Sequence, residues 1–132
     1  MKQIDSYYQR IEEAKIKRIQ ENFSTIGHDV GFLYSLSCVA AYKLSGDVRA
    51  REAALMAADH LKYRFQEKGQ FIQAWGQMTD RSKYRLIVDC LLNIPILYWA
   101  TETTGDQSYA EIAYRHFRTT VDNAIREDGS SF

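Results

Sequence analysis

The chain has 132 residues, with 17 Lys+Arg against 17 Asp+Glu, a formal net charge of zero, and 45% hydrophobic residues. This length supports one domain with a real core, and the composition excludes collagen-like, low-complexity and disordered proteins. Because the charges balance and no basic block is present, nucleic acid and membrane surfaces are not expected as partners.

Five helices joined by glycine-containing turns are predicted in chain order. The first is supported by apolar residues at mostly three- and four-residue steps, a spacing that lines one face of a helix. The predicted ranges are about 6–22, 29–46, 48–65, 84–103 and 107–125. Asp47 and Asp106 precede the third and fifth helices as caps, and Pro95 is expected to kink or restart the fourth. Residues 66–80 break the pattern and are expected to form an ordered loop or a short strand.

Two parts of the chain repeat each other with a period near 60 residues. The matched positions are Gly46-Asp47 with Gly105-Asp106, residues 67–69 with residues 127–129, and Asp29 with Asp89. Each unit is predicted to be a helical hairpin with a return loop. A period near 60 suits a toroid in which inner and outer helices alternate. The predicted fold class is therefore all-α, with Asp29 and Asp89 facing one funnel.

Asp89 lies in the apolar run 86–92, where a carboxylate is expected to lose hydration. Burying such a charge unpaired is costly, so the group should be hydrogen-bonded or protonated near neutral pH. A carboxyl with a raised pKa is what a general acid at neutral pH requires. The alternative is a structural aspartate that caps the helix or bonds Tyr84 or Asn93. The spacing alone favours neither interpretation.

Asp29 has an ordinary interpretation as an N-cap, because its carboxylate can accept hydrogen bonds from the first N–H groups of a helix. The repeat adds a second interpretation. It places Asp29 and Asp89 on neighbouring inner helices, whose axes pack about 8–10 Å apart. Two carboxyls so placed can flank one small substrate, and a carboxyl pair is the usual equipment for glycosidic chemistry.

Three other side chains have both a functional and an ordinary interpretation. Trp75 belongs to the predicted loop, where an indole either offers a flat face to a sugar ring or covers the core. His28 either donates a hydrogen bond to an anionic substrate or pairs with a nearby carboxylate. His60 and His116 lie among charged neighbours on presumed outer helices and are predicted to be solvated.

The two cysteines, Cys38 and Cys90, sit far apart in apolar runs and show no metal-ligand spacing. They are interpreted as buried free thiols of a cytoplasmic protein, and no metal site is predicted. The first ten residues lack a hydrophobic signal region, and the longest apolar run is too short to span a bilayer.

Several segments of this chain resemble, in order, the unsaturated glucuronyl hydrolases, glycoside hydrolase family 88. The resemblance runs from about Ile11 to Phe132. It is carried by His28-Asp29-Val30-Gly31-Phe32-Leu33-Tyr34-Ser35, Gln73-Ala74-Trp75-Gly76, residues 86–95, Tyr114-Arg115-His116-Phe117 and Arg126-Glu127-Asp128-Gly129-Ser130.

The resemblance implies an (α/α)6 barrel that acts on oligosaccharides released by polysaccharide lyases. The non-reducing end of such an oligosaccharide is a uronic acid with a C4=C5 double bond. In this family an aspartate protonates the vinyl ether and activates a water that hydrates the double bond, and the resulting hemiketal collapses to release the neighbouring sugar. No metal or organic cofactor takes part. By the same resemblance Asp89 is the general acid/base, Asp29 supports the reacting ring, and His28, Phe32 and Trp75 line the substrate subsite.

The chain departs from the family in length, since it looks like about five helices of a twelve-helix barrel, truncated at both ends. Residues 1–132 are therefore expected to form a single partial barrel domain. Exposed inner-helix faces favour self-association, and the isolated chain is expected to be inactive or to need other pieces. Two alternatives remain: the unsaturated rhamnogalacturonyl hydrolases, which share the fold, and a non-catalytic helical-repeat module that binds a partner.

Overall fold

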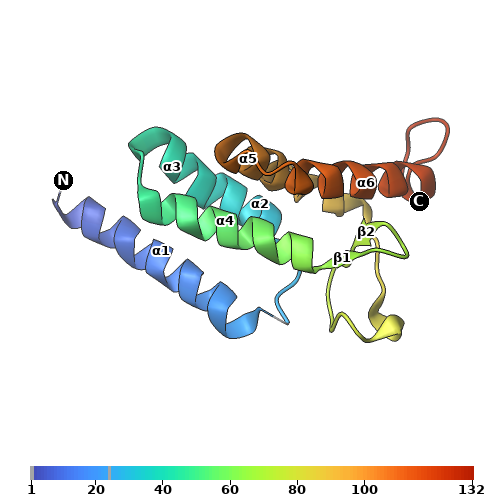
Figure 1. Ribbon diagram of the computed structural model, residues 1–132, viewed down its shortest axis with the longest axis horizontal. Helices are drawn as coiled ribbons and strands as arrows, with labels where there is room; N and C mark the ends of the chain where they lie inside the picture. Colours follow the sequence, from blue (N-terminus) through green and yellow to red (C-terminus); the bar gives the residue numbers. More distant parts are fainter. Residues whose placement is uncertain (1, 24) are drawn as a thin grey trace.

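The computed structural model describes residues 2–23 and 25–132, with side chains from residue 6 onward except residue 8. Six α-helices make up the body of the molecule (Figure 1). They are α1 (Lys2–Asn22), α2 (Val30–Tyr34), α3 (Ala40–Ser45), α4 (Val48–Tyr63), α5 (Pro95–Thr104) and α6 (Gln107–Ala124). A two-stranded antiparallel hairpin, β1 (Phe65–Gln66) with β2 (Phe71–Ile72), follows α4. The predicted all-α class is confirmed.

Helix α4 is central, with α1 on one side and α2, α3 and α5 on the other (Figure 1). Its buried face is made largely of alanine, whose small side chain lets neighbouring helices approach closely. The alanines are Ala50, Ala53, Ala54, Ala57 and Ala58. Larger apolar side chains from the other elements, including Ile19, Ile72 and Leu97, complete the core around this face. Burying this surface is the main force that holds the short helices together.

The predicted second helix is one continuous helical segment with a wider turn in its middle. Helices α2 and α3 are joined by a π-helical turn, Ser35–Val39, so the chain does not leave the helical path. The segment ends at Gly46, which has φ 73° and donates its N–H to the carbonyl of Tyr42 at 2.8 Å. A left-handed conformation of this kind favours glycine because it has no Cβ.

The internal repeat is confirmed at its two helix–helix turns, whereas the matched glycines of the return loops differ, because Gly129 has a positive φ and Gly69 does not. Gly105 has φ 81° and donates its N–H to the carbonyl of Thr101 at 2.8 Å, as Gly46 does in the first unit. The carboxylates of Asp47 and Asp106 each accept a hydrogen bond from the N–H two residues later. Both hairpins therefore turn by the same local chemistry, as predicted.

The fourth predicted helix is shorter than expected. Helix α5 begins at Pro95, which occupies the first helical position and needs no N–H partner there. Before it, Tyr84 and Ile87 have extended backbone angles, and Val88–Leu92 forms a 3-10 helix. The proline thus marks a restart, and residues 84–94 lie outside α5. This change moves Asp89 from a helix interior to a short turn.

The prediction that His60 and His116 are solvated is wrong. Both side chains are buried. The Nε2 of His60 lies 2.8 Å from the carbonyl of Ile26, and the Nδ1 of His116 accepts a hydrogen bond from the N–H of Ile72. Burial lowers the pKa of each imidazole to about 4. These histidines tie α4 and α6 to the loops of the first unit and are neutral near pH 7.

Acid is expected to destabilise this fold. Folded His60 and His116 resist protonation down to about pH 4, whereas a histidine in an unfolded chain titrates near 6.5. The unfolded state therefore binds more protons between these values, and the free energy of unfolding falls as pH falls, by up to about 3 kcal/mol for each histidine. Urea unfolding at pH 7.5 and 5 measures this loss. In His60→Gln and His116→Gln the loss should shrink, and an unchanged pH dependence in both variants would contradict the assignment.

Both cysteines are buried free thiols, as predicted. The Sγ of Cys90 lies 3.2 Å from the hydroxyl of Thr120, and burial raises the pKa of this thiol to about 11. In the described part of the chain no helix has the length and hydrophobicity needed to cross a membrane.

Candidate functional site

Asp29 lies immediately before α2, at the end of the loop that follows α1. Its backbone angles are already helical, and its carboxylate makes no capping hydrogen bond. Asp29 therefore occupies the N-cap position of α2, but the prediction that its side chain caps the helix is wrong. The side chain is instead 59% exposed and lies beside the imidazole of His28. A carboxylate in this position is free to meet a ligand.

Asp89 lies in the 3-10 helix Val88–Leu92 and is 48% exposed. The expected burial is wrong, because this short helix turns Val88 and Leu92 toward solvent, while Cys90 is buried and Leu91 packs partly buried against the core. The structural alternatives also fail. Ile87, not Asp89, occupies the cap position of the 3-10 helix, and Asn93 contacts the backbone carbonyl of Asp89, not its carboxylate. The side chain that the structure places beside this carboxylate is His28, not Tyr84. The carboxyl of Asp89 is thus accessible at the surface of the second repeat.

His28 brings these two carboxylates together, and the predicted convergence of Asp29 and Asp89 is confirmed. The imidazole is 2% exposed, with its Nε2 3.5 Å from an Asp29 oxygen and 3.8 Å from an Asp89 oxygen. Burial lowers the pKa of His28, an effect that the two carboxylates oppose. A largely neutral imidazole therefore lies behind two half-exposed acids that come from different repeats.

The same three side chains are the group to consider for a metal ion. One ligand atom from each of His28, Asp29 and Asp89 lies within 4.8 Å of the other two. Nitrogen and carboxylate oxygen are ordinary ligands for a divalent cation. The arrangement equally suits proton transfer, because two acids that face one small volume can act as donor and acceptor on a bound molecule.

Arg64 organises the loops around this group and was not singled out by the sequence. It is fully buried after α4, and its guanidinium donates to the carbonyls of Gln73 (2.7 Å), Ile26 (3.1 Å) and Gly76 (3.0 Å). Ile26 lies two residues before His28. One side chain therefore holds both the loop before α2 and the loop that carries Trp75. A lone arginine at the end of an amphipathic helix carries no sequence signal for such a role.

Trp75 is 45% exposed on the loop after β2. Its loop is joined to the Asp29 segment by a hydrogen bond from the N–H of His28 to the carbonyl of Ala74, at 2.9 Å. Phe32 is half-buried on the first turn of α2. Its backbone N–H is bonded to Asn93, so the structure places it close to the Asp89 segment. The five residues singled out from the sequence thus belong to one set of bonded segments.

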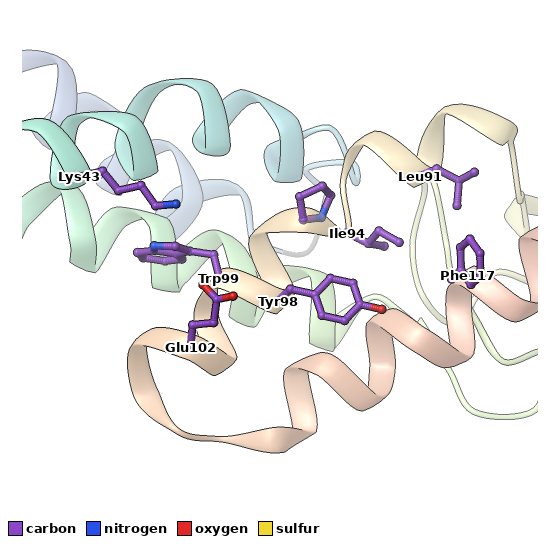
Figure 2. Close-up of a pocket in the computed structure, with 8 residues that line it drawn as sticks. Lys43, Leu91, Ile94, Tyr98, Trp99, Glu102 and Phe117 are labelled. Carbon is purple, nitrogen blue, oxygen red and sulfur yellow. The ribbon is translucent and has the colours of Figure 1, made fainter.

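A hollow of about 440 Å³ lies apart from these residues, between α3, α5 and α6 (Figure 2). Tyr98 and Trp99 of α5, Lys43 of α3 and Phe117 of α6 line it, together with residues 91, 94, 95 and 102. None of the five predicted site residues contributes to it. The carboxylate group therefore lies at an open surface of this chain and not in this hollow.

Comparison with known proteins gives relatives of one kind. A curated relative from Streptococcus pneumoniae, named unsaturated chondroitin disaccharide hydrolase, is 53% identical over 117 residues, which are 89% of this chain and 30% of the relative. No family model matches the chain.

Solved structures agree. A crystal structure of an unsaturated glucuronyl hydrolase from Streptococcus agalactiae matches 100% of this chain with 44% identity and a TM-score of 0.88, over 33% of its own chain. An aspartate-to-asparagine variant from the same organism, complexed with dGlcA-GalNAc6S, matches with 35% identity and a TM-score of 0.75, over 30% of its chain. The chain thus spans about a third of the length of these relatives. The predicted hairpins of an (α/α)6 barrel are confirmed.

Proposed function

Because this chain belongs to the unsaturated glucuronyl hydrolase family, we propose that the protein containing it hydrates the C4=C5 double bond of an unsaturated uronic acid. The substrate is an oligosaccharide left by a polysaccharide lyase, and hydration of the unsaturated sugar at its non-reducing end separates that sugar from the rest of the oligosaccharide. One observation carries the proposal: Asp29 and Asp89, which come from different repeats, meet at His28. Residues 1–132 are proposed to be a single partial domain of the complete barrel.

The roles of the two acids are proposed from the family resemblance, together with the chemistry of the substrate. In a vinyl ether the ring oxygen stabilises positive charge at C5, so the proton must be added to C4. Asp89 donates this proton, and the negative charge of Asp29 stabilises the oxocarbenium-like state that results. The Asp89 carboxylate then takes a proton from the water that attacks C5. The hemiketal formed in this way collapses, and the bond to the neighbouring sugar breaks.

The other three residues are proposed to hold the sugar. His28 is positioned between both acids and, being buried, keeps them oriented toward one volume. Trp75 and Phe32, whose segments are bonded to those of His28 and Asn93, are proposed to supply aromatic surface to the sugar. No metal or organic cofactor is required for hydration of an alkene by a carboxylic acid and water.

The names of the relatives favour a substrate derived from chondroitin. The relative from Streptococcus pneumoniae is named for unsaturated chondroitin disaccharides, and the Streptococcus agalactiae variant holds dGlcA-GalNAc6S. We therefore propose an unsaturated disaccharide of a uronic acid and N-acetylgalactosamine as the first substrate to test. The protein is further proposed to act in the cytoplasm without nucleic-acid or membrane partners.

Loss of the ultraviolet absorbance of the alkene is the direct assay. The full-length protein that contains residues 1–132 should consume an unsaturated chondroitin disaccharide. An unsaturated rhamnogalacturonan disaccharide serves as the competing substrate. Turnover of the rhamnogalacturonan disaccharide alone would identify the protein as a rhamnogalacturonyl hydrolase. Binding of these disaccharides without turnover of either one would favour a non-catalytic module. The separate 132-residue chain is proposed to be inactive and, through exposed apolar side chains such as Leu36 and Leu44, to self-associate.

Trp75→Ala is expected to weaken substrate binding with little effect on the fold. An indole that is 45% exposed contributes modestly to the core, whereas loss of an aromatic stacking partner costs about 1 kcal/mol, or about fivefold in affinity. Steady-state kinetics should therefore show a higher KM with a smaller change in kcat. The matched control is Tyr114→Ala, which removes an exposed aromatic side chain from α6. Equal KM values for Trp75→Ala and the unmodified protein would remove Trp75 from the subsite.

A further inference from the structure

Asn93 connects the two segments that carry the carboxylates. It follows the 3-10 helix of Asp89, and its side chain is buried, with the residue only 1% exposed. The side-chain Oδ1 accepts a hydrogen bond from the N–H of Phe32 at 2.9 Å, and the Nδ2 donates to the carbonyl of Asp89 at 3.5 Å. One amide thus bonds both the first turn of α2, which follows Asp29 directly, and the turn of Asp89.

Gly31 lets these segments touch. A Cβ at Gly31 would lie 2.4 Å from the carbonyl oxygen of Asn93 and 2.6 Å from its Cα and Cβ. These are distances that real Cβ atoms do not adopt, so any larger residue would push the two segments apart. The backbone of α2 and the backbone of Asn93 are therefore in direct contact two residues after Asp29 and four residues after Asp89.

The side chains of Asp29 and Asp89 make only weak contacts with the residue that lies between them, His28. Each is about half exposed, and each lies 3.5 Å or more from the Nε2 of His28, beyond a strong hydrogen bond. Their separation must therefore come from the backbone on which they are mounted. The backbone contact nearest to both is the one made by Asn93 and Gly31.

We propose that Asn93 is a positioning residue that sets the distance between Asp29 and Asp89, with Gly31 as the surface against which it packs. This inference rests on the proposed function, in which both acids act on one sugar ring. Misplacing a catalytic group by about 1 Å can lower a rate by about 100-fold. Asn93 acts by holding the acids and touches no substrate.

Asn93→Ala in the full-length protein tests the proposal. The variant removes both side-chain hydrogen bonds, so kcat for the unsaturated chondroitin disaccharide should fall by about 100-fold while KM changes less than about threefold. Circular dichroism at the assay temperature establishes that the variant is folded. Asn123→Ala, on the exposed face of α6, is the matched control. A folded Asn93→Ala with unchanged kcat would overturn the proposal.

A more conservative substitution at Asn93 provides a second test in case Asn93→Ala does not fold. Asn93→Ser leaves a hydroxyl in the buried site. If Asn93 sets the position of the two acids, this variant should show a smaller fall in kcat than Asn93→Ala. If neither variant folds, Asn93 serves the fold alone and the proposal is wrong.

The NMR titration of His28 gives a readout independent of turnover. The groups that bear on its imidazole are Asp29, Asp89, Arg64 and His116. Because the Asp89 carboxylate raises the pKa of His28, displacement of Asp89 in Asn93→Ala should lower that pKa. The further effect of Asp89→Asn should then be smaller in the Asn93→Ala background than in the unmodified protein. If Asp89→Asn changes the pKa of His28 equally in both backgrounds, the positioning role is wrong. This outcome does not depend on turnover, so it also applies if the unmodified protein fails to hydrate the substrate.

Discussion

Replacing Asp89 with asparagine is expected to lower the turnover of the full-length protein by a factor of about 10³ or more, because one group serves as both proton donor and proton acceptor. An asparagine amide has nearly the same shape but cannot protonate C4 or accept a proton from water. Since the Asp89 side chain is 48% exposed and caps no helix, the variant should unfold at nearly the same temperature as the unmodified protein. The measurement is the rate of loss of alkene absorbance at saturating substrate.

The control for this experiment is Asp122→Asn, which makes the same chemical change at an exposed position of α6. That variant should retain full turnover. A comparable loss in both variants would point to a general effect of charge. Near-normal turnover by Asp89→Asn would remove Asp89 as the general acid/base, whatever Asp29 does.

Arg64→Met is expected to produce the largest loss of stability. The guanidinium donates hydrogen bonds to three carbonyls in a fully buried place. Methionine fills part of the volume but removes the Arg64 donor from the carbonyls of Gln73 and Gly76, while the carbonyl of Ile26 keeps its contact with the Nε2 of His60. Removing one partner of a buried network of this kind is expected to lower the free energy of unfolding of the full-length protein by about 4 kcal/mol. Thermal and urea unfolding measure the change.

Two variants separate charge from geometry at this position. Arg64→Lys keeps the charge but lacks the planar fork that reaches three acceptors, so it should recover only part of the lost stability. Arg118→Met removes an exposed arginine from α6 and should change the free energy of unfolding by less than about 0.5 kcal/mol. If the free energy of unfolding of Arg64→Met lies within about 1 kcal/mol of that of the unmodified protein, the hydrogen bonds of Arg64 to the three carbonyls do not stabilise the fold as proposed.

The features that the sequence predicted well are set by local chemistry. Gly46 and Gly105 end helices because their backbone angles favour glycine, and Asp47 and Asp106 begin helices because their carboxylates reach the nearest free N–H groups. Neither effect needs a distant partner. The equivalence of the two helix–helix turns follows from these signals, and the period that they define led to the predicted convergence of Asp29 and Asp89.

The errors have a common origin in contacts between distant segments. His60 and His116 look like surface residues beside their charged neighbours, yet both are buried against backbone atoms of loops that lie 34 and 44 residues away. Asp89 looks buried in an apolar run, yet the backbone before Pro95 is not α-helical and turns its side chain outward. Local composition cannot report either outcome, because burial is decided by which segments pack together.

The π-helical turn at Ser35–Val39 separates two tasks within one helix. An extra residue in a turn shifts the angular phase of every later side chain by about 100° relative to an uninterrupted α-helix. The phase of α2, which follows Asp29, therefore suits its contact with Asn93. The side chains of α3 follow a different phase, which brings Lys43 to the hollow beside Trp99 (Figure 2). Restoring α-helical spacing at this turn would therefore rotate Lys43 away from the hollow while leaving the end of the helix next to Asp29 in place.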